Sequence, residues 1–335
     1  MSFVVRAATA RDLPALYEMA KLTGGGFTNL PADRGALAAK LERSAAAFSR
    51  SEMTLTDELF VLVLENTVTG EVRGTAQIYT QVGQRSPFYS YKITALSQHS
   101  PELSRTVTAD ILELVTDLGG ASEVGGLFLH PSERAGGLGL LLARSRYLFI
   151  AMHRARFADR ILAELRGIID ERGAAPFWDA IGRHFFGMGF QEADYFNAIH
   201  GTQFIADLMP RHPVYVAMLP ASARAVIGLP HPSGRAAMRM LEDEGFAHRG
   251  FIDIFDGGPA MTARTDEVAS IRGAVRSDSV RAGLAEGEAA LLSAGQLGDF
   301  RCCYGRRELA GGDLAIDDDA AALLSGGGSV WSIAR

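Results

Sequence analysis

A chain of 335 residues is longer than one ordinary domain requires, so we expect two packed units or one large unit with a sizeable core. Hydrophobic residues make up 47% of the chain and charged residues 21%, a balance that is typical of a globular protein and excludes a disordered one. The formal charge of −6 argues against a general nucleic-acid-binding protein, because such proteins usually carry a basic excess.

The N-terminal part of the chain alternates short apolar runs with amphipathic stretches. The pattern predicts strands over residues 3–5, 59–65, 72–82, 123–129 and 160–166. It predicts helices over residues 11–21, 33–48, 104–118, 136–153 and 176–187. Thr69-Gly70 separates the second strand from the third, so we expect these two to form a hairpin. The alternation as a whole predicts an α/β or α+β unit with a mixed sheet.

Another amphipathic helix is expected over residues 235–246. It ends in Gly-Phe, as residues 177–190 do, and a strand-like run follows each of them. Because glycine after a helix is a common stop signal, this similarity leaves two alternatives open. The region is either a partial second unit of the same kind or an unrelated structure.

From about Met261 the sequence changes to short apolar runs separated by glycine and aspartate, which predict a small β-rich C-terminal domain. The runs are residues 289–292, 300–304 and 330–333. Three consecutive aspartates, residues 317–319, suit the N-terminus of a short helix. We therefore expect domains at residues 1–195, 196–260 and 261–335.

The N-terminal residues 1–13 are charged and lack the apolar region of an export signal. The most apolar stretch, residues 138–152, is interrupted by Arg144 and Arg146, so it does not resemble a membrane-spanning helix. Cys302 and Cys303 are adjacent, and adjacent cysteines rarely bridge each other. We expect a cytoplasmic protein with reduced thiols that binds neither nucleic acid nor membrane.

Residues 125–142 combine a strand, a proline-containing turn and Arg134-x-x-Gly137-x-Gly139 leading into an apolar helix. Glycines at the start of a helix let backbone N–H groups approach an anion closely, and the helix dipole favours negative charge there. The segment is neither a P-loop nor a dinucleotide fingerprint, because the required lysine and glycine spacing are missing. The pattern alone leaves open a phosphate-binding loop and a glycine-rich turn without a ligand.

The spacing Leu-x-x-x-Pro-x-x-Arg-x-x-Gly-x-Gly in this segment resembles the acyl-coenzyme A motif of GNAT acyltransferases. A closer resemblance, over at least residues 3–259, is to the arginine N-succinyltransferase family, including its arginine/ornithine succinyltransferase subunits. Separate blocks in the same order carry it: TGGGFTNLP (23–31), AELRG (163–167), PFW (176–178), RHFF (183–186), FIADLMP (204–210), IGLPHP (227–232) and FIDIFDGGP (251–259). The last 75 or so residues match only loosely.

The resemblance implies a GNAT-like mixed sheet flanked by helices. It also implies the reaction of succinyl-coenzyme A with L-arginine to give coenzyme A and N2-succinyl-L-arginine, which opens arginine catabolism by the succinyl route. Succinyl-coenzyme A would be a co-substrate, and no permanently bound cofactor or metal is expected. Three alternatives stay open: a preference for ornithine or another amino acid, one subunit of a heteromeric enzyme, and an inactive coenzyme A-binding regulatory subunit. A homo- or hetero-oligomer is compatible with each.

Acyl transfer to an amine requires a neutral amine and a proton for the leaving thiolate. Histidine suits such proton transfer because its pKa lies near 6.5. Among the eight histidines, His231 is distinctive because it lies between Pro230 and Pro232, which restrict the conformation of the loop. The local sequence by itself fits a capping histidine as well as a catalytic one. The resemblance implies that His231 is the catalytic proton donor.

For the coenzyme, the resemblance implies that backbone groups from Leu127 to Leu129 contact the pantetheine arm, with Leu127 matching a known contact position. It implies that Arg134, Gly137 and Gly139 hold the pyrophosphate.

The two substrates also carry charges that need partners. A buried succinyl carboxylate needs a cation, for which Arg166 and Arg183 are candidates. A guanidinium acceptor needs a carboxylate, which Glu164, Asp253 or Asp256 could supply. The loop at residues 23–31, with Gly25 and Gly26, is either part of the acceptor site or a hinge between two helices.

Overall fold

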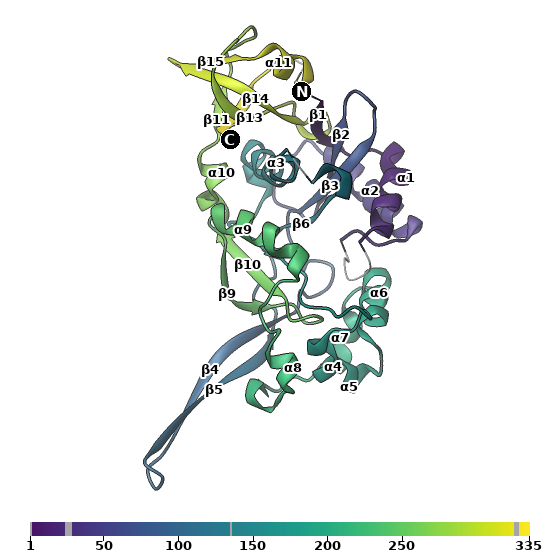
Figure 1. Ribbon diagram of the computed structural model, residues 1–335, viewed down its shortest axis with the longest axis vertical. Coiled ribbons are helices and arrows are strands. Elements are labelled where there is room, and N and C mark those ends of the chain that lie inside the picture. The colour runs from purple at the N-terminus through teal and green to yellow at the C-terminus, as the bar shows by residue number, and fades with distance from the viewer. Residues whose placement is uncertain (1, 24–28, 135, 325–327) are drawn as a thin grey trace.

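The computed structural model describes residues 2–23, 29–134, 136–324 and 328–335 (Figure 1). A long mixed sheet runs through the molecule in the order β11-β16-β13-β14-β1-β2-β3-β6-β7-β10-β9-β4-β5-β8. Neighbouring strands on this path are antiparallel except β6 and β7, which are parallel. The expected mixed sheet flanked by helices is therefore present.

The strands are β1 (Phe3–Ala7), β2 (Leu59–Asn66), β3 (Val72–Tyr79), β4 (Ser90–Ser100), β5 (Arg105–Val115), β6 (Ser122–Leu129), β7 (Arg160–Glu164), β8 (Val214–Tyr215), β9 (Ala247–Ile252), β10 (Pro259–Arg264), β11 (Val275–Ser277), β12 (Val280–Arg281), β13 (Glu288–Ala294), β14 (Arg301–Ala310), β15 (Asp313–Ile316) and β16 (Val330–Ala334). The α-helices are α1 (Leu13–Lys21), α2 (Arg34–Ser49), α3 (Leu138–Met152), α4 (Pro176–Ala180), α5 (Gly182–Phe186), α6 (Phe190–His200), α7 (Gln203–Leu208), α8 (Ala221–Arg224), α9 (Arg235–Asp243), α10 (Ala269–Arg272) and α11 (Asp318–Leu323).

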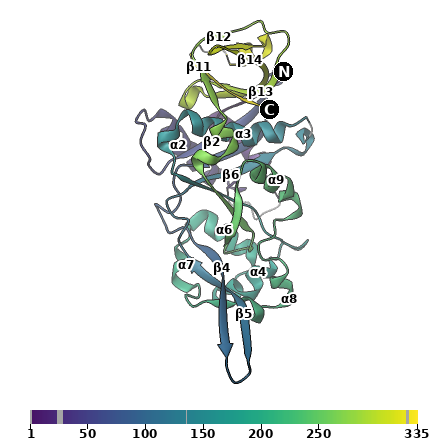
Figure 2. The same cartoon turned by 90° about the vertical axis from the view of Figure 1, so that its left-hand side faces the viewer.

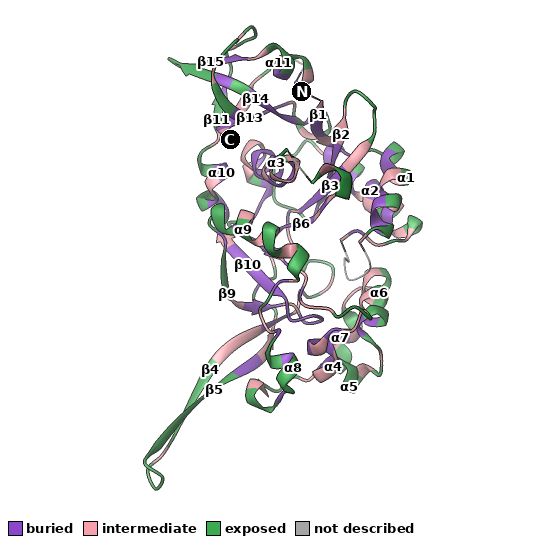
Figure 3. Cartoon of the chain, in the orientation of Figure 1, coloured by how far each residue is buried: buried purple, intermediate pink, exposed green. Residues whose placement is uncertain are grey.

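Strand β2 is buried on both faces because helices cover both sides of the sheet there (Figure 3). Leu59, Val61 and Val63 pack with α1 and α2, whereas the alternating residues Phe60 and Leu62 pack with α3. This arrangement explains why β2 is a continuous apolar run and not an alternating one. The predicted hairpin of β2 and β3 is confirmed.

A second core cluster surrounds Trp178, which is fully buried. It joins the short helices α4 to α8 to the bases of β4 and β9. The single helix predicted over residues 176–187 is wrong, because the segment breaks at Ile181 into α4 and α5. Gly182 lies directly against Trp178: a Cβ atom at Gly182 would be 2.5 Å from the indole ring. Close packing on this ring accounts for the break.

The helix predicted over residues 104–118 is also wrong, since this segment forms β5. Every residue of β5 is paired with β4, from Ser90 opposite Val115 to Ser100 opposite Arg105. The segment contains Thr, Val and Ile residues whose branched side chains favour a strand, and cross-strand pairing outweighed its helix-like apolar spacing. The two strands project from the body as a ribbon whose outer half is exposed (Figures 2 and 3).

The expected C-terminal strands are present as β13, β14 and β16, and Asp317 caps α11 through its side chain, as the aspartate run predicted. Strand β14 pairs with β1, so these strands extend the main sheet. The domain boundaries given above stay a prediction. Within the described ranges, no helix is both long and apolar enough to cross a membrane.

Phe149 of α3 lies at the centre of a group of aromatic rings in the core that includes β2 and the C-terminal strands. Its ring contacts Phe60 of β2, Phe157 and, from the C-terminal strands, Phe300 at centroid distances of 4.8, 6.3 and 5.1 Å. The side chain is fully buried. We predict that Phe149→Ala lowers the free energy of unfolding by about 3–5 kcal/mol, through lost burial and the cavity left behind. Urea denaturation measures this, with Phe149→Leu as the matched smaller change. A loss below about 1 kcal/mol for the alanine variant would contradict the central role of Phe149.

Candidate active site

Strands β6 and β7 pair at their first residues and then separate. Ser122 lies opposite Ile161 and Glu123 opposite Leu162, but β6 continues to Leu129 without further pairing to β7 in the described residues. Gly126 has a φ of 56°, and the pairing of β6 with β3 shifts register at this level. Beyond residue 123, the edge of β6 that faces β7 therefore offers backbone donors and acceptors to a ligand.

The predicted phosphate loop lies directly after β6. Gly136 and Gly137 have φ values of 71° and 80°, a conformation that favours glycine, and α3 begins at Leu138. The first N–H groups of α3 lack partners within the helix and point toward the loop. Gly139 is more open, since a Cβ there would have its nearest neighbour at 3.8 Å. The geometry matches an anion-binding turn.

The other residues predicted to bind coenzyme differ in exposure. Arg134 is exposed beside the loop. Leu127 and Leu129 pack their side chains against the core on the α3 side, so any contact that they make with a ligand in the gap comes from their backbone.

His231 lies at the end of β7, on the other side of the gap. Its backbone N–H donates to the Arg166 carbonyl at 2.8 Å, two residues beyond the end of β7. The ring is partly buried. The backbone N–H of Ser233 donates to Nδ1 at 3.2 Å, and the Ser233 Oγ lies 2.7 Å from the same atom. Because a backbone N–H can only donate, Nδ1 is the acceptor and the proton of the neutral ring is on Nε2.

Burial and the positive charge of Arg166 lower the pKa of His231 below its usual value. The neutral imidazole with its Nε2 proton is therefore the form favoured near pH 7. The sequence alone left open whether His231 caps a turn or takes part in chemistry, and the structure shows that it does cap the turn at Pro232–Gly234. Capping with Nδ1 leaves Nε2 available, so the two roles are compatible.

Buried carboxylates gather on the sheet near the end of β7. Burial raises the pKa of Glu164 well above its usual range, and the neighbouring charges of Asp253 and Glu123 add to this effect. The Glu164 Oε1 atom is buried and has no hydrogen-bond partner among the described residues. Burial also raises the pKa values of Glu123 and Asp253. Such a group of acids is unfavourable by itself and suits a cationic ligand.

The carboxylates of Asp253 and Asp256 both accept hydrogen bonds from backbone N–H groups. The Asp253 Oδ1 accepts N–H groups from Phe255 and Asp256 at 2.7 and 2.9 Å. The Asp256 carboxylate accepts N–H groups from Gly167 and Gly258 at 2.7 and 2.8 Å. Asp256 therefore joins the segment after β7 to the turn before β10. The buried Oε1 of Glu164, by contrast, has no hydrogen-bond partner within the described ranges.

The described residues that flank the loop predicted to shape the acceptor site lie on this same face. Gly25 and Gly26 lie outside the described residues. The residues on either side of the loop contact the site: the Thr23 carbonyl accepts from Arg166 at 3.4 Å, and the Asn29 side chain donates to Glu123 at 3.3 Å. The Arg166 Nε is buried without a partner among the described residues, which suits an anionic group of a ligand.

Sequence reasoning missed a polar network beside Glu123. Lys40 of α2 donates to the Asn29 carbonyl at 3.1 Å and to the Tyr79 hydroxyl at 3.0 Å, and Tyr79 donates to the Asn29 side chain at 3.0 Å. The one available signal was Glu123 itself, an acid within an otherwise apolar strand. Lys40 and Tyr79 gave no signal, because only the fold brings them to Asn29.

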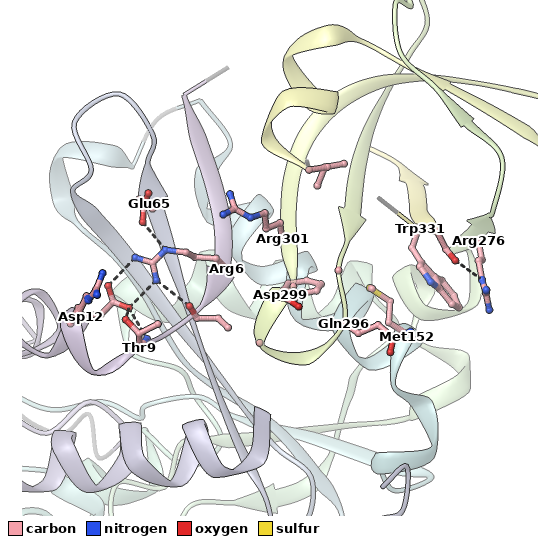
Figure 4. Close-up of a pocket in the computed structure, with 18 residues that line it drawn as sticks. Arg6, Thr9, Asp12, Glu65, Met152, Arg276, Gln296, Asp299, Arg301 and Trp331 are labelled. Atoms are coloured by element: carbon pink, nitrogen blue, oxygen red, sulfur yellow. Dashed lines mark hydrogen bonds and ion pairs between the residues drawn. The ribbon is translucent and has the colours of Figure 1, made fainter. Parts of the chain in front are cut away.

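Two features lie outside this site. Arg183 is exposed and pairs with Asp179 at 3.4 Å, so the structure does not bring it to Glu164 or His231. A cavity of about 940 Å³ opens between β1 and the C-terminal strands, but no predicted site residue lines it (Figure 4). Its Arg6 is neutralised by Asp12 and Glu65 at 2.8 and 2.6 Å. Among the described residues, no cluster of His, Cys, Asp and Glu could hold a metal ion.

Comparisons with known proteins agree on one family. The model for the arginine N-succinyltransferase beta subunit matches residues 3–270, and the model for its C-terminal domain matches residues 272–327. An arginine N-succinyltransferase of Citrobacter koseri is 42% identical over 285 residues, which are 85% of this chain and 83% of that protein. An arginine N-succinyltransferase subunit beta of Pseudomonas aeruginosa is 44% identical over 268 residues, 80% of this chain and 78% of that protein.

A solved structure agrees as well. Arginine/ornithine succinyltransferase subunit AI from Pseudomonas aeruginosa superposes with a TM-score of 0.91 at 33% identity, covering 99% of this chain and 98% of the other. The fold class predicted from the sequence is confirmed.

The environment of His231 leads to a prediction about its titration. Because burial and then Arg166 lower its pKa, we expect NMR titration to place the His231 pKa below 6.5. Arg166→Gln removes the positive charge and should raise that pKa toward 6.5, whereas Arg183→Gln, at an exposed arginine that pairs with Asp179, should leave it unchanged. A His231 pKa above 6.5 in the wild-type protein would show that a negative group, and not Arg166, governs the ring.

Proposed function

This chain belongs to the arginine N-succinyltransferase family, and we propose that it transfers the succinyl group of succinyl-coenzyme A to the α-amino group of L-arginine. The products are coenzyme A and N2-succinyl-L-arginine, and the reaction opens arginine breakdown by the succinyl route. One observation carries the proposal: His231 and a glycine-rich turn lie on opposite sides of the gap between the parallel strands β6 and β7. His231 is held at the end of β7, and the glycine turn follows β6. Succinyl-coenzyme A acts as a co-substrate and is not a resident cofactor.

The coenzyme would occupy the gap between β6 and β7. Unpaired backbone groups of β6, including those of Leu127 and Leu129, suit the amides of the pantetheine arm, which can extend the sheet in the manner of an added strand. The glycine turn and the start of α3 suit the pyrophosphate, with Arg134 beside it. Gly137 and Gly139 allow this close approach because neither carries a side chain.

His231 would handle the proton that the reaction moves. The amine nitrogen attacks the thioester carbonyl carbon, a C–N bond forms, and the C–S bond breaks. Nε2 donates its proton to the leaving sulfur and then takes up the proton that the former amine loses, while Nδ1 stays the acceptor of the Ser233 N–H. One proton leaves the nitrogen and one reaches the sulfur, so the histidine returns to its starting form.

The charged groups near the end of β7 would orient both substrates. Glu164, whose Oε1 has no hydrogen-bond partner among the described residues, fits the guanidinium of arginine, and Asp253 is a second acid beside it. Arg166, whose Nε has no partner in the described part of the chain, fits the succinyl carboxylate. Burial and then repulsion from neighbouring acids raise the pKa of Glu164, and a bound guanidinium would offset both effects by stabilising the carboxylate.

Two further points concern specificity and assembly. Since the solved relative is described as an arginine/ornithine succinyltransferase subunit, ornithine is a second candidate acceptor. Relatives described as subunits also favour an oligomer, made of identical or of homologous chains. The cytoplasmic location expected from the sequence stays a prediction.

Thiol release from succinyl-coenzyme A tests the activity and the role of His231 together. We expect rapid release with arginine, less with ornithine and almost none without an amine. His231→Ala should lower turnover by about 10²–10⁴-fold while changing coenzyme affinity little. His130→Ala is the matched control, because His130 caps a turn with the same His-Pro-Ser sequence and the same Nδ1 contacts.

Three results would each contradict a different part of the proposal. No thiol release with any amine would contradict the activity, and equal release with ornithine would contradict a strict preference for arginine. Equal losses of turnover in the two histidine variants would show that His231 only caps its turn.

Glu164→Gln tests the acceptor site. The neutral amide keeps the size of the side chain but loses the charge, so we expect the KM for arginine to rise by about 10–100-fold, in line with roughly 1.5–3 kcal/mol for a charged hydrogen bond. The KM for succinyl-coenzyme A should change little. Glu267→Gln, at an exposed position, serves as the control. A fall in kcat with no change in the KM for arginine would show that Glu164 acts elsewhere in the reaction.

A further inference from the structure

The C-terminal strands place a cation on the phosphate loop. Arg335 directly follows β16, and its backbone N–H donates to the Ala289 carbonyl at 2.9 Å, which fixes the chain at the end of the sheet. Its guanidinium donates to the Gly136 carbonyl at 3.4 Å. Figures 1 and 2 both draw the C-terminus close to α3. Nearly 200 residues separate Arg335 from the loop in sequence, so only the fold brings them together.

Tyr304 of β14 holds this arginine in place. The guanidinium of Arg335 lies over the Tyr304 ring at 4.2 Å from its centre. The Tyr304 hydroxyl donates to the Gly137 carbonyl at 2.7 Å, so the same side chain also supports the loop. A Cβ atom on Gly137 would lie 2.6 Å from the Arg335 Nη2 and 3.3 Å from the Tyr304 hydroxyl. The absence of a side chain at Gly137 is therefore what allows Arg335 to reach the loop.

Arg335 is exposed, and its guanidinium contacts the Gly136 carbonyl and the Tyr304 ring. Within residues 2–23, 29–134, 136–324 and 328–335, no carboxylate side chain pairs with Arg335. The first turn of α3 presents the positive end of a helix dipole at the same loop. Two positive groups side by side are unfavourable alone and become favourable when an anion lies between or beside them. Phosphate oxygens, which accept several donors at once, are an anion of this kind.

We propose that Arg335 is a coenzyme-binding residue whose guanidinium contacts a phosphate group of coenzyme A together with the N-terminus of α3. The proposal rests on the coenzyme assignment made above. It gives the C-terminal part of the chain a role in the reaction, because Tyr304 of β14 and Arg335, which follows β16, contact a loop that belongs to the N-terminal part. Coenzyme A carries a pyrophosphate and a 3′-phosphate, and either group has the required chemistry.

Calorimetric titration of the full chain with coenzyme A tests the proposal. Arg335→Gln should weaken binding by about 10–100-fold, and Arg335→Lys, which keeps the charge but loses the planar fork, should weaken it less. Repeating the titration with 3′-dephospho-coenzyme A identifies the phosphate: the effect of Arg335→Gln persists if the pyrophosphate is the partner and disappears if the 3′-phosphate is. Arg281→Gln, an exposed arginine of β12, is the matched control and should bind like the wild type.

Each result decides something. Wild-type affinity of Arg335→Gln for both ligands would overturn the proposal, and tighter binding would also overturn it, because Arg335 would then compete with the phosphate. A wild-type protein that does not bind coenzyme A would instead remove the proposed function. If Arg335→Gln unfolds, Arg335→Lys decides in its place: a loss of affinity that shrinks as salt is raised would support the charge contact, and wild-type affinity at every salt concentration would overturn the proposal.

Discussion

The separation of β6 from β7 after two residue pairs is the constraint on which the site depends. Had the strands continued to pair, their backbone groups would satisfy each other and leave nothing for a ligand. The register shift near Gly126 and the short length of β7 produce the gap. Everything assigned to the reaction then lies along its sides: the glycine turn follows β6, while Glu164 and His231 lie at the end of β7.

The two sides of the gap suit ligands of opposite charge. On the β6 side, the start of α3 and Arg335 are positive and suit the phosphates of a coenzyme. On the β7 side, burial and acidic neighbours raise the pKa of Glu164, and a bound guanidinium would stabilise its charged form. This separation explains how a chain with a net charge of −6 can bind an anionic coenzyme: local potential at a site, and not the sum over the sequence, sets the affinity.

Features that are continuous in sequence could be predicted, and features made by folding could not. The segment from β6 through the glycine turn to α3 was readable because strand, turn and helix are adjacent. The failure at β5 has the opposite cause: its pairing with β4 decided its structure, and local periodicity carries no information on pairing. Lys40 and Arg335 acquired their positions through contacts between distant segments, so no spacing in the sequence indicated them.

The structure also accounts for why the resemblance appeared in separate blocks. Three of the blocks meet at the end of β7. The block at 251–259 contributes Asp256, which binds the N–H of Gly167 in the block at 163–167. The block at 227–232 is tied to both, because Gly228 donates to the Gly257 carbonyl and His231 donates to the Arg166 carbonyl, each at 2.8 Å. The position of His231 is thus fixed by backbone hydrogen bonds from two other segments. A substitution that loosens the turn at residues 253–258 should therefore displace the histidine without touching it.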